Sequence, residues 1–329
     1  MDKNTIIGLT LIFVLLVAWQ QFTAPSAEEL EARQARQDSI QQVQNRKDSL
    51  QQLEADTVES VKAVETQDDS LMLLQRQAGY GPFAPAASGE KEEVVLENDL
   101  MKMWVSTKGG KIDSVLMKHH FRLEYTEDGD EIQKPLYLLG DQENKFEYFF
   151  PIANLPSGGV STGDLYFQVA ESTPNRVVLR APASGGGYFE QRYEIADGSY
   201  NVDYDITFEG LNNVIERNAD NIQLNWVNYL SKLEHNTAYE RRYSTVYFKP
   251  VEDDPDYCSC TSDDTEDIDE QRLKWISHAN QFFNSSLIAE DAFSSAKLQT
   301  KMLPEDDEDL KLLVSDIAVP YQHSSSETF

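Results

Sequence analysis

Histidine, cysteine and paired carboxylates are the side chains best suited to chemistry, and this chain of 329 residues offers few of them in useful arrangements. Its five histidines are His119, His120, His235, His278 and His323. The sequence contains no Gly-x-Ser-x-Gly elbow, phosphate-binding loop, dinucleotide fingerprint or His-Glu-x-x-His helix. We therefore predict no catalytic residue and no cofactor-binding residue.

Two pairs of adjacent residues could still take part in proton transfer. Glu234 and His235 lie beside a strand-like segment and could act as general acid and base on a sugar, but an exposed edge or loop is the favoured interpretation. His119 and His120 are expected in a turn that follows a strand. Neither pair requires the protein to be an enzyme.

Two acidic segments raise the possibility of a bound cation. Residues 251–270 contain ten acidic residues and no Lys or Arg, and residues 305–309 are five acids in succession. A calcium loop needs alternating ligands, a turn glycine and a closing glutamate, yet no glycine lies between Val251 and Glu290. We therefore expect solvated acidic loops and no metal ligand.

Cys258 and Cys260 lie inside the first acidic segment, separated by one residue. Because no histidine is nearby, this spacing is a poor match to a zinc site. A tight local disulfide in an oxidising compartment and a pair of free thiols both remain open.

The charge balance excludes one large class of partner. The chain has 28 Lys and Arg against 57 Asp and Glu, a formal net charge of −29. It therefore lacks the positive charge needed to displace counterions from nucleic acid. Hydrophobic residues still make up 40% of the chain and aromatic residues 10%, which is enough for a core. We expect an acidic, anchored or exported globular protein.

A transmembrane signal anchor is predicted at residues 4–22. The segment from Ile6 to Trp19 is apolar or small except for Thr10. As a helix, residues 4–22 would span about 28 Å, close to the thickness of a bilayer core. A cleaved signal peptide, with its cleavage site near Ala24, is the less favoured alternative.

Residues 23–92 are predicted to form a polar stalk helix and a linker. Residues 26–54 are rich in Gln, Glu, Arg and Ala and contain no Gly or Pro, which favours a solvated helix. A dimerising coiled coil is the alternative, but the apolar positions are too sparse for a heptad seam. Residues 79–89 are rich in Gly, Pro and Ala, a composition typical of a linker, so the next domain is expected to begin near residue 92.

Residues 93–329 are predicted to form a mainly β domain, a large antiparallel β-sandwich. Apolar and polar residues alternate without a break over residues 200–208. Further strand candidates are 101–105, 165–169, 177–180, 188–195, 222–226 and 243–248. Glycine-rich turns separate them, and no long helical pattern intervenes. Residues 273–284 fit either a strand or a short amphipathic helix.

Several segments resemble the YidC-type membrane protein insertases. The first eight residues, followed by the apolar run, resemble the start of that family. Residues 94–98, 106–112 and 115–118 resemble the beginning of its periplasmic domain, including the turn at Gly109-Gly110. Lys274-Trp275-Ile276 and Gln281-Phe282-Phe283 resemble a signature near the end of that domain.

The resemblance implies a first transmembrane helix that anchors the protein in the bacterial inner membrane, then a supersandwich-like β domain in the periplasm, and then a membrane core of five further helices. It implies an insertase and chaperone that assists the insertion, folding and assembly of integral membrane proteins, with or without the Sec translocon. Its partners would be nascent membrane proteins, Sec translocon components and the lipid bilayer through residues 4–22, with no cofactor. Because no second apolar run of about 18 residues follows Phe22, we expect the chain to be a piece of a longer insertase.

Two other classes of protein remain open. An anchored carbohydrate-active enzyme of the mutarotase type would need two histidines and a carboxylate in one cleft. An anchored periplasmic scaffold or binding module would need no such site. Epimerisation of a sugar by the soluble part of the protein would favour the enzyme.

Calcium is expected to add nothing to the stability of the protein beyond its contribution to ionic strength. If the acidic segments are solvated loops, they repel each other at low ionic strength. Salt reduces the distance over which this repulsion acts, from about 30 Å at 0.01 M to about 8 Å at 0.15 M, and so stabilises the protein. Thermal melts in sodium chloride and calcium chloride at equal ionic strength test this. A calcium-specific rise of several degrees, lost when Asp263, Asp264, Asp267 and Asp269 are changed to Asn, would show a metal site instead.

Overall fold

The structure is a computed structural model that describes residues 61–125, 128, 130–324 and 326–328. The chain divides into two compact units, residues 1–71 and 72–329. The predicted anchor at 4–22 and stalk helix at 26–54 lie outside the described residues. Within the described part, no helix is both long enough and apolar enough to cross a membrane.

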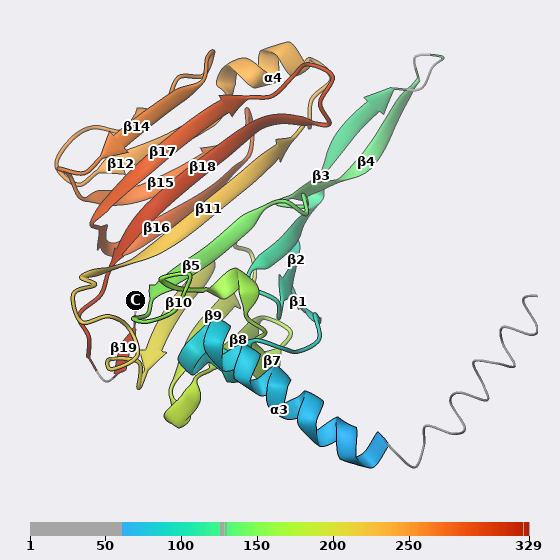
Figure 1. Ribbon diagram of the computed structural model, residues 1–329. Coiled ribbons are helices and arrows are strands. Elements are labelled where there is room, and N and C mark those ends of the chain that lie inside the picture. Colours follow the sequence, from blue (N-terminus) through green and yellow to red (C-terminus); the bar gives the residue numbers. More distant parts are fainter. Residues whose placement is uncertain (1–60, 126–127, 129, 325, 329) are drawn as a thin grey trace, which may run out of the picture. The chain divides into compact units, whose positions relative to one another are not determined.

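The second unit is built from four antiparallel sheets, which confirms the prediction of a mainly β fold (Figure 1). The first sheet has the order β1 (Glu93–Glu97), β2 (Met101–Ser106), β3 (Ile112–Tyr125), β4 (Glu131–Leu138). The five-stranded sheet has the order β19 (Ser326–Thr328), β10 (Val202–Glu209), β9 (Tyr188–Ile195), β8 (Arg176–Pro182), β7 (Gln168–Thr173). The six-stranded sheet has the order β14 (Asp264–Ile268), β17 (Ser295–Met302), β18 (Asp309–Pro320), β11 (Asn221–Ser231), β5 (Lys145–Pro151), β6 (Gly159–Ser161). The last sheet, here called the outer sheet, has the order β13 (Asp256–Tyr257), β12 (Thr245–Pro250), β15 (Leu273–Ala279), β16 (Asn284–Phe293).

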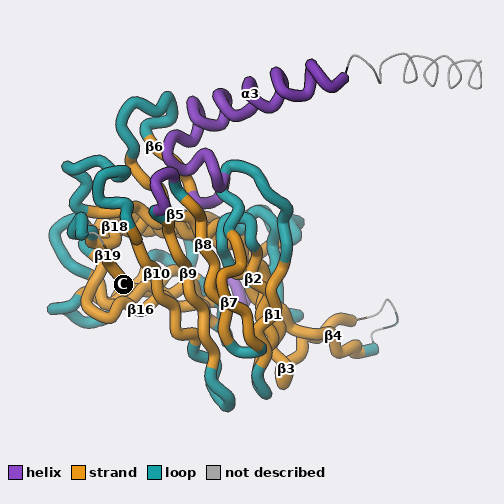
Figure 2. The backbone as a smooth tube through the Cα atoms, turned by 90° about the horizontal axis from the view of Figure 1, so that it is seen from below, coloured by secondary structure: helices purple, strands orange, loops and turns teal. Residues whose placement is uncertain are grey.

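Few helices accompany these sheets. The α-helices in the described part are α3 (Val61–Tyr80) and α4 (Thr237–Tyr243), and the 3₁₀ helices are η1 (Gly81–Ala86), η2 (Thr162–Asp164) and η3 (Ser184–Gly186). In the view of Figure 2, β10, β9, β8 and β7 lie side by side, and the hairpin of β3 and β4 extends beyond the other strands.

The strands predicted from alternating apolar and polar residues match the strands of the structure best where one face of the strand is buried. β9 has the bounds predicted for it, and alternate residues along its whole length are buried. The run predicted at 165–169 is different, because Leu165 and Phe167 are buried in the segment after η2 and β7 begins only at Gln168. The residues predicted at 243–248 also differ, since Tyr243 ends α4 and the strand begins at Thr245.

A continuous hydrophobic core joins the sheets. Phe150 of β5 lies with its ring centroid 5.0 Å from that of Phe189 in β9 and 5.8 Å from that of Phe208 in β10. Between the six-stranded and outer sheets, Trp226 of β11 stacks on His278 of β15 at 3.8 Å. The sheets are therefore packed as layers around shared aromatic contacts.

The segment predicted as a linker contributes to this core. Residues 81–86 form η1, in which Phe83, Ala84 and Ala86 are buried. Phe83 is fully buried and stacks on Phe150 with 5.2 Å between ring centroids. Although this segment is rich in Gly, Pro and Ala, it is not a free linker, because the ring of Phe83 docks it on the core.

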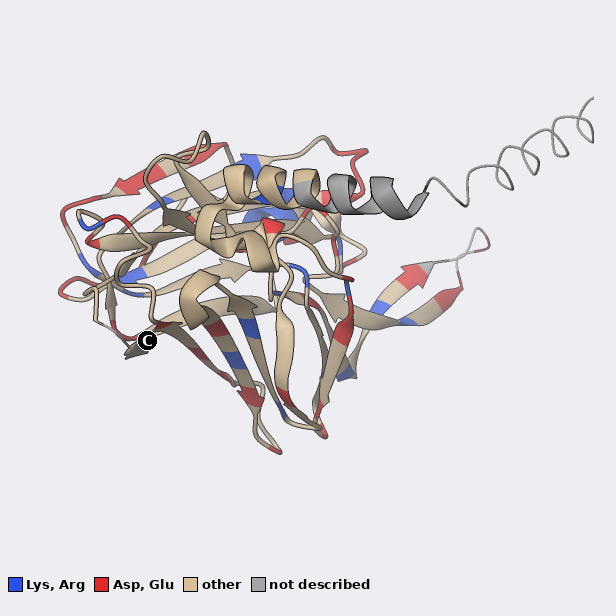
Figure 3. Ribbon diagram, turned by 60° about the horizontal axis from the view of Figure 1, so that its bottom comes forward, with Lys and Arg blue, Asp and Glu red and all other residues tan. Residues whose placement is uncertain are grey.

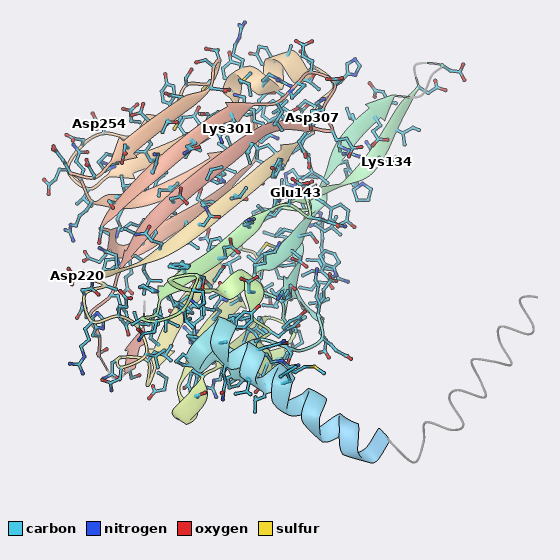
Figure 4. All side chains as sticks on the ribbon, in the orientation of Figure 1. Lys134, Glu143, Asp220, Asp254, Lys301 and Asp307 are labelled. Carbon is cyan, nitrogen blue, oxygen red and sulfur yellow. The ribbon has the colours of Figure 1, made fainter. Side chains whose placement is uncertain are left out.

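Carboxylates meet near one end of β18. Asp309 begins that strand, and Asp141 and Asp307 come from neighbouring loops. Figure 4 marks Asp307, together with Glu143 from the same loop as Asp141. Burial first, and then the charges of Asp141 and Asp307, raise the pKa of Asp309 to about 6.

Truncation of Phe83 is expected to destabilise the β structure strongly. Phe83→Ala removes a fully buried ring and leaves a cavity, for which about 3–5 kcal/mol is typical. Met72→Ala is the control, because that side chain is exposed and its loss should change stability by less than about 0.5 kcal/mol. Equal urea midpoints for the two variants would show that η1 does not hold the core.

The pKa of Asp309 predicts that the protein gains stability as the pH falls from about 7 to about 5. An acid whose pKa is higher in the folded state than in the unfolded state stabilises the fold below its unfolded pKa, and this contribution is lost as the pH rises through about 6. Asp309→Asn mimics the neutral form, so it should be more stable than the wild type at pH 7.5, and this advantage should shrink as the pH falls toward about 4, the ordinary pKa of an aspartate. Urea titrations of both proteins at each pH measure the free energy of unfolding. An equal change of this free energy with pH in the two proteins would contradict the prediction.

Candidate functional site

His119 and His120 do not lie in a turn, which corrects the prediction. They fall inside β3, where the pairing with β4 shifts register between Met117 and Phe121. His119 Nε2 lies 3.0 Å from the carbonyl oxygen of Asp99, and the ring of His120 packs edge-on against Phe283 at 5.3 Å. The irregularity interrupts the alternation of apolar and polar residues, so the pattern appeared to end too early.

Glu234 and His235 lie in the loop between β11 and α4, as the sequence favoured. The backbone N–H of Glu234 donates to Oε2 of Glu240 at 3.2 Å, and that of Leu233 donates to Oε1 at 3.0 Å. Burial raises the pKa of Glu240, although these backbone donors favour its charged form. The carboxylate of Glu240 therefore holds the loop against α4.

His278 is a core residue of β15. It is buried, and its Nε2 lies 2.8 Å from Oγ of Ser315. Burial lowers the pKa of His278 to about 3, so the ring is neutral near pH 7. A buried neutral imidazole stacked on Trp226 suits packing between sheets better than proton transfer to a sugar.

The two cysteines are free thiols. Cys258 is buried, and desolvation raises its pKa to about 12, which keeps it protonated and unreactive. The carbonyl oxygen of Cys260 accepts a hydrogen bond from Nζ of Lys311 at 2.8 Å. Lys311 is itself buried, and burial lowers its pKa to about 8.

The acidic segment at 251–270 is more ordered than the predicted loop. Residues 264–268 form β14, an edge strand paired with β17, and residues 256–257 form β13. Acidic side chains are an effective way to protect an edge strand from pairing with another chain. In the described part of the protein, no group of three or more His, Cys, Asp or Glu has an arrangement that could hold a metal ion. Acidic residues also gather on loops and hairpin ends (Figure 3).

The candidate site is a groove of about 750 Å³ that runs over the outer sheet, here called the aromatic groove. Its lining residues are Tyr239, Tyr243, Tyr247, Trp275, Ser277, Ala279, Asn280, Gln281, Phe282, Phe283, Asn284, Ser286 and Ile288. None of these side chains carries a charge at neutral pH, although 26% of the residues in the chain are charged.

Strand register produces the floor of the groove. Ser277 pairs with Tyr247 on one side and with Ser286 on the other, and Trp275 pairs with Ile288. Because directly paired residues of antiparallel strands share a face, all five project from the same face of the sheet. The opposite face carries Ile276 and His278 into the core.

A helix and a turn complete the walls. The first turn of α4 is capped by Asn236, whose side chain accepts a hydrogen bond from the N–H of Tyr239 at 3.0 Å. The rings of Tyr239 and Tyr243 lie 4.9 Å apart on that helix. Opposite them, the N–H of Asn280 donates to the carbonyl of Phe283 at 2.7 Å and closes the turn that presents Phe282.

Large apolar side chains are unusually exposed in this groove. Phe282 is 68% exposed and Ile288 is 67% exposed. The outer face of an antiparallel sheet normally carries polar residues, so a neutral aromatic face indicates a binding surface. The sequence did not reveal it, because each face of β15 combines an apolar with a polar residue, Trp275 with Ser277 outside and Ile276 with His278 inside, so the strand shows no alternation.

Comparison with known families identifies the β structure. The family described as the YidC periplasmic domain matches residues 93–329. The membrane protein insertase YidC of Parabacteroides distasonis is 33% identical over 99% of this chain and 50% of its own length. That of Phocaeicola vulgatus is 30% identical over 91% of this chain and 44% of its own length. The chain therefore spans about half the length of these curated relatives.

Solved structures show a more distant likeness. A galactose mutarotase-like protein from Lactobacillus casei is 11% identical, with a TM-score of 0.40 over 72% of this chain and 95% of its own. A putative aldose 1-epimerase from Escherichia coli is 7% identical, with a TM-score of 0.34 over 73% of this chain and 97% of its own. A likeness at this level says nothing about activity, whereas the family match covers every sheet described above. The chain thus belongs to the YidC family and contains its periplasmic domain.

Proposed function

We propose that this chain is the N-terminal and periplasmic portion of a membrane protein insertase and chaperone. Such a protein would assist the insertion, folding and assembly of integral membrane proteins, with or without the Sec translocon. The observation that carries the proposal is the match of residues 93–329 to the YidC periplasmic domain, supported by insertase relatives along nearly the whole chain. Insertion would be an activity of a complete insertase, and this chain spans about half the length of the curated insertase relative from Parabacteroides distasonis.

The proposed organisation has three parts. Residues 4–22 anchor the protein in the inner membrane through contact with the lipid bilayer, residues 23–92 act as a spacer, and residues 93–329 work in the periplasm. The net charge of −29 supports protein partners rather than nucleic acid. Nascent membrane proteins and Sec translocon components are the partners proposed.

The aromatic groove is the surface proposed to meet these partners. Membrane proteins carry long apolar segments, which are exposed before they are inserted and packed. Phe282, Ile288 and Trp275 offer apolar contact without charge, and the exposed amide side chain of Asn284 can hydrogen-bond to backbone groups of a partner. The groove therefore suits brief contact with apolar polypeptide and requires no cofactor.

Depletion of the gene product that contains this chain should leave a larger fraction of a reporter membrane protein uninserted, as measured by protease accessibility in intact spheroplasts. Restoring the wild-type gene should restore insertion several-fold. Unchanged insertion upon full depletion would contradict the proposed function.

The role of the groove is tested separately in the restored strain. Phe282→Ser combined with Ile288→Ser removes two exposed apolar side chains, so folding should be preserved while insertion of the reporter falls. Thr265→Ser, on the exposed edge strand β14, is the matched control and should behave as the wild type. Normal insertion by the double variant would show that the groove is not the contact surface, without affecting the assignment of the chain as part of an insertase.

A further inference from the structure

The strand β16 leaves one of its edges without a partner. It is the last strand of the outer sheet and pairs only with β15 among the described residues. In an antiparallel ladder, the backbone groups that do not face the neighbouring strand point toward the free edge as donors and acceptors. The free edge of β16 can therefore accept one more strand.

Other edge strands of the described sheets are protected against such pairing. β1 carries Glu93 and Glu97, β4 carries Lys134 and Pro135, β7 carries Glu171 beside a register shift, and β14 carries Asp264, Glu266 and Asp267. β6, β13 and β19 have three residues or fewer. Charge, proline, irregular pairing and shortness are the usual means by which proteins prevent edge-to-edge association.

β16 has none of these features in its first six residues. Asn284 to Ala289 contains no charged residue and no proline, and its pairing with β15 is regular from Asn284 to Ile288. Acidic residues follow only at Glu290 and Asp291. An uncharged and exposed edge of this kind is open to pairing with another extended chain.

The same strand forms one wall of the aromatic groove. Asn284, Ser286 and Ile288 line the groove and are exposed, while Leu287 and Ala289 point the other way and are half-buried against the core. A strand added at this edge would place alternate side chains on the groove side, beside Ile288 and close to Trp275. Since the groove lining is uncharged, those side chains must be uncharged as well to avoid the cost of desolvating a charge.

We propose that β16 binds extended, uncharged segments of unfolded polypeptide by strand addition, with the aromatic groove receiving alternate side chains. The backbone edge supplies affinity that does not depend on sequence, and the neutral groove supplies the preference for apolar residues. The identity of the bound polypeptide rests on the proposed function, because an insertase meets unfolded segments of membrane proteins. Binding itself can be measured independently of insertion.

The test uses the full chain in a mild detergent and a synthetic peptide of eight alternating Val and Thr residues with blocked ends. Hydrogen exchange at the amides of residues 284–289 is followed by mass spectrometry. At a peptide concentration about tenfold above its Kd, the outward-facing amides should exchange about tenfold more slowly, because only the unoccupied edge exchanges. The same peptide with every backbone nitrogen methylated keeps its side chains but loses its donors, and it should give no protection.

Variants separate the edge from the groove. Ser286→Lys places a charge on the exposed side of β16 and should abolish protection by the peptide, whereas Thr265→Lys on β14 should leave it unchanged. Melting temperatures close to that of the wild type confirm that both variants are folded. Equal protection by the methylated peptide, or none by the unmodified peptide at millimolar concentration, overturns strand addition.

A second copy of the chain is the competing occupant. Protection of residues 284–289 that rises with protein concentration in the absence of peptide would mean that β16 pairs with β16 of another copy, and it would overturn the proposal. Failure of peptide binding leaves the depletion experiment unaffected, and normal insertion upon depletion leaves peptide binding unaffected. The two ideas can therefore fail separately.

Discussion

The constraint on which the rest of the site depends is the orientation of β15. Ile276 and His278 must face the six-stranded sheet, where His278 stacks on Trp226 and its Nε2 lies 2.8 Å from Oγ of Ser315. Successive side chains of a strand point to opposite faces, so Trp275 and Ser277 must face outward. A shift of one residue would expose His278 and bury Trp275 instead. The aromatic groove is thus a consequence of how the inner face is packed.

Buried charges fix the surroundings of this sheet. Glu240 accepts hydrogen bonds from the backbone of the loop before α4, and Lys311 donates to the carbonyl oxygens of Ser244 and Cys260. Each charge is costly to bury, and each is compensated by backbone groups that would otherwise lack partners. They tie α4 and the segment after β13 to the sandwich. The walls of the groove are therefore held by polar contacts, and its floor by apolar packing.

The sequence predicts this structure well where a residue pattern reflects a difference in burial between two faces, and poorly where a single contact or an irregular pairing decides. β9, β10 and β11 were predictable because one face of each is buried and the other is not. The docking of residues 81–86 was missed because the prediction used the average composition of the segment, whereas the single ring of Phe83 is enough to dock it on the core. His119 and His120 were misplaced because irregular pairing breaks the alternation. The groove was unpredictable in principle, since it combines residues from β12, β15, β16 and α4 that only the register brings together.

Charge distribution links the groove to its edge strand. A chain with a net charge of −29 has ample acid to protect every edge, and β14 shows how densely it can do so. Yet the residues that line the groove and the first six residues of β16 are all uncharged. Random placement of charges, at 26% of residues, would leave few such contiguous surfaces, so the neutral region stands out from its surroundings. Repulsion from the acidic surface keeps copies of the protein apart, and this permits an unprotected edge to persist without aggregation. The acidic surface and the neutral groove are therefore two parts of one arrangement: the first limits self-association, and the second leaves a place where an uncharged chain can bind.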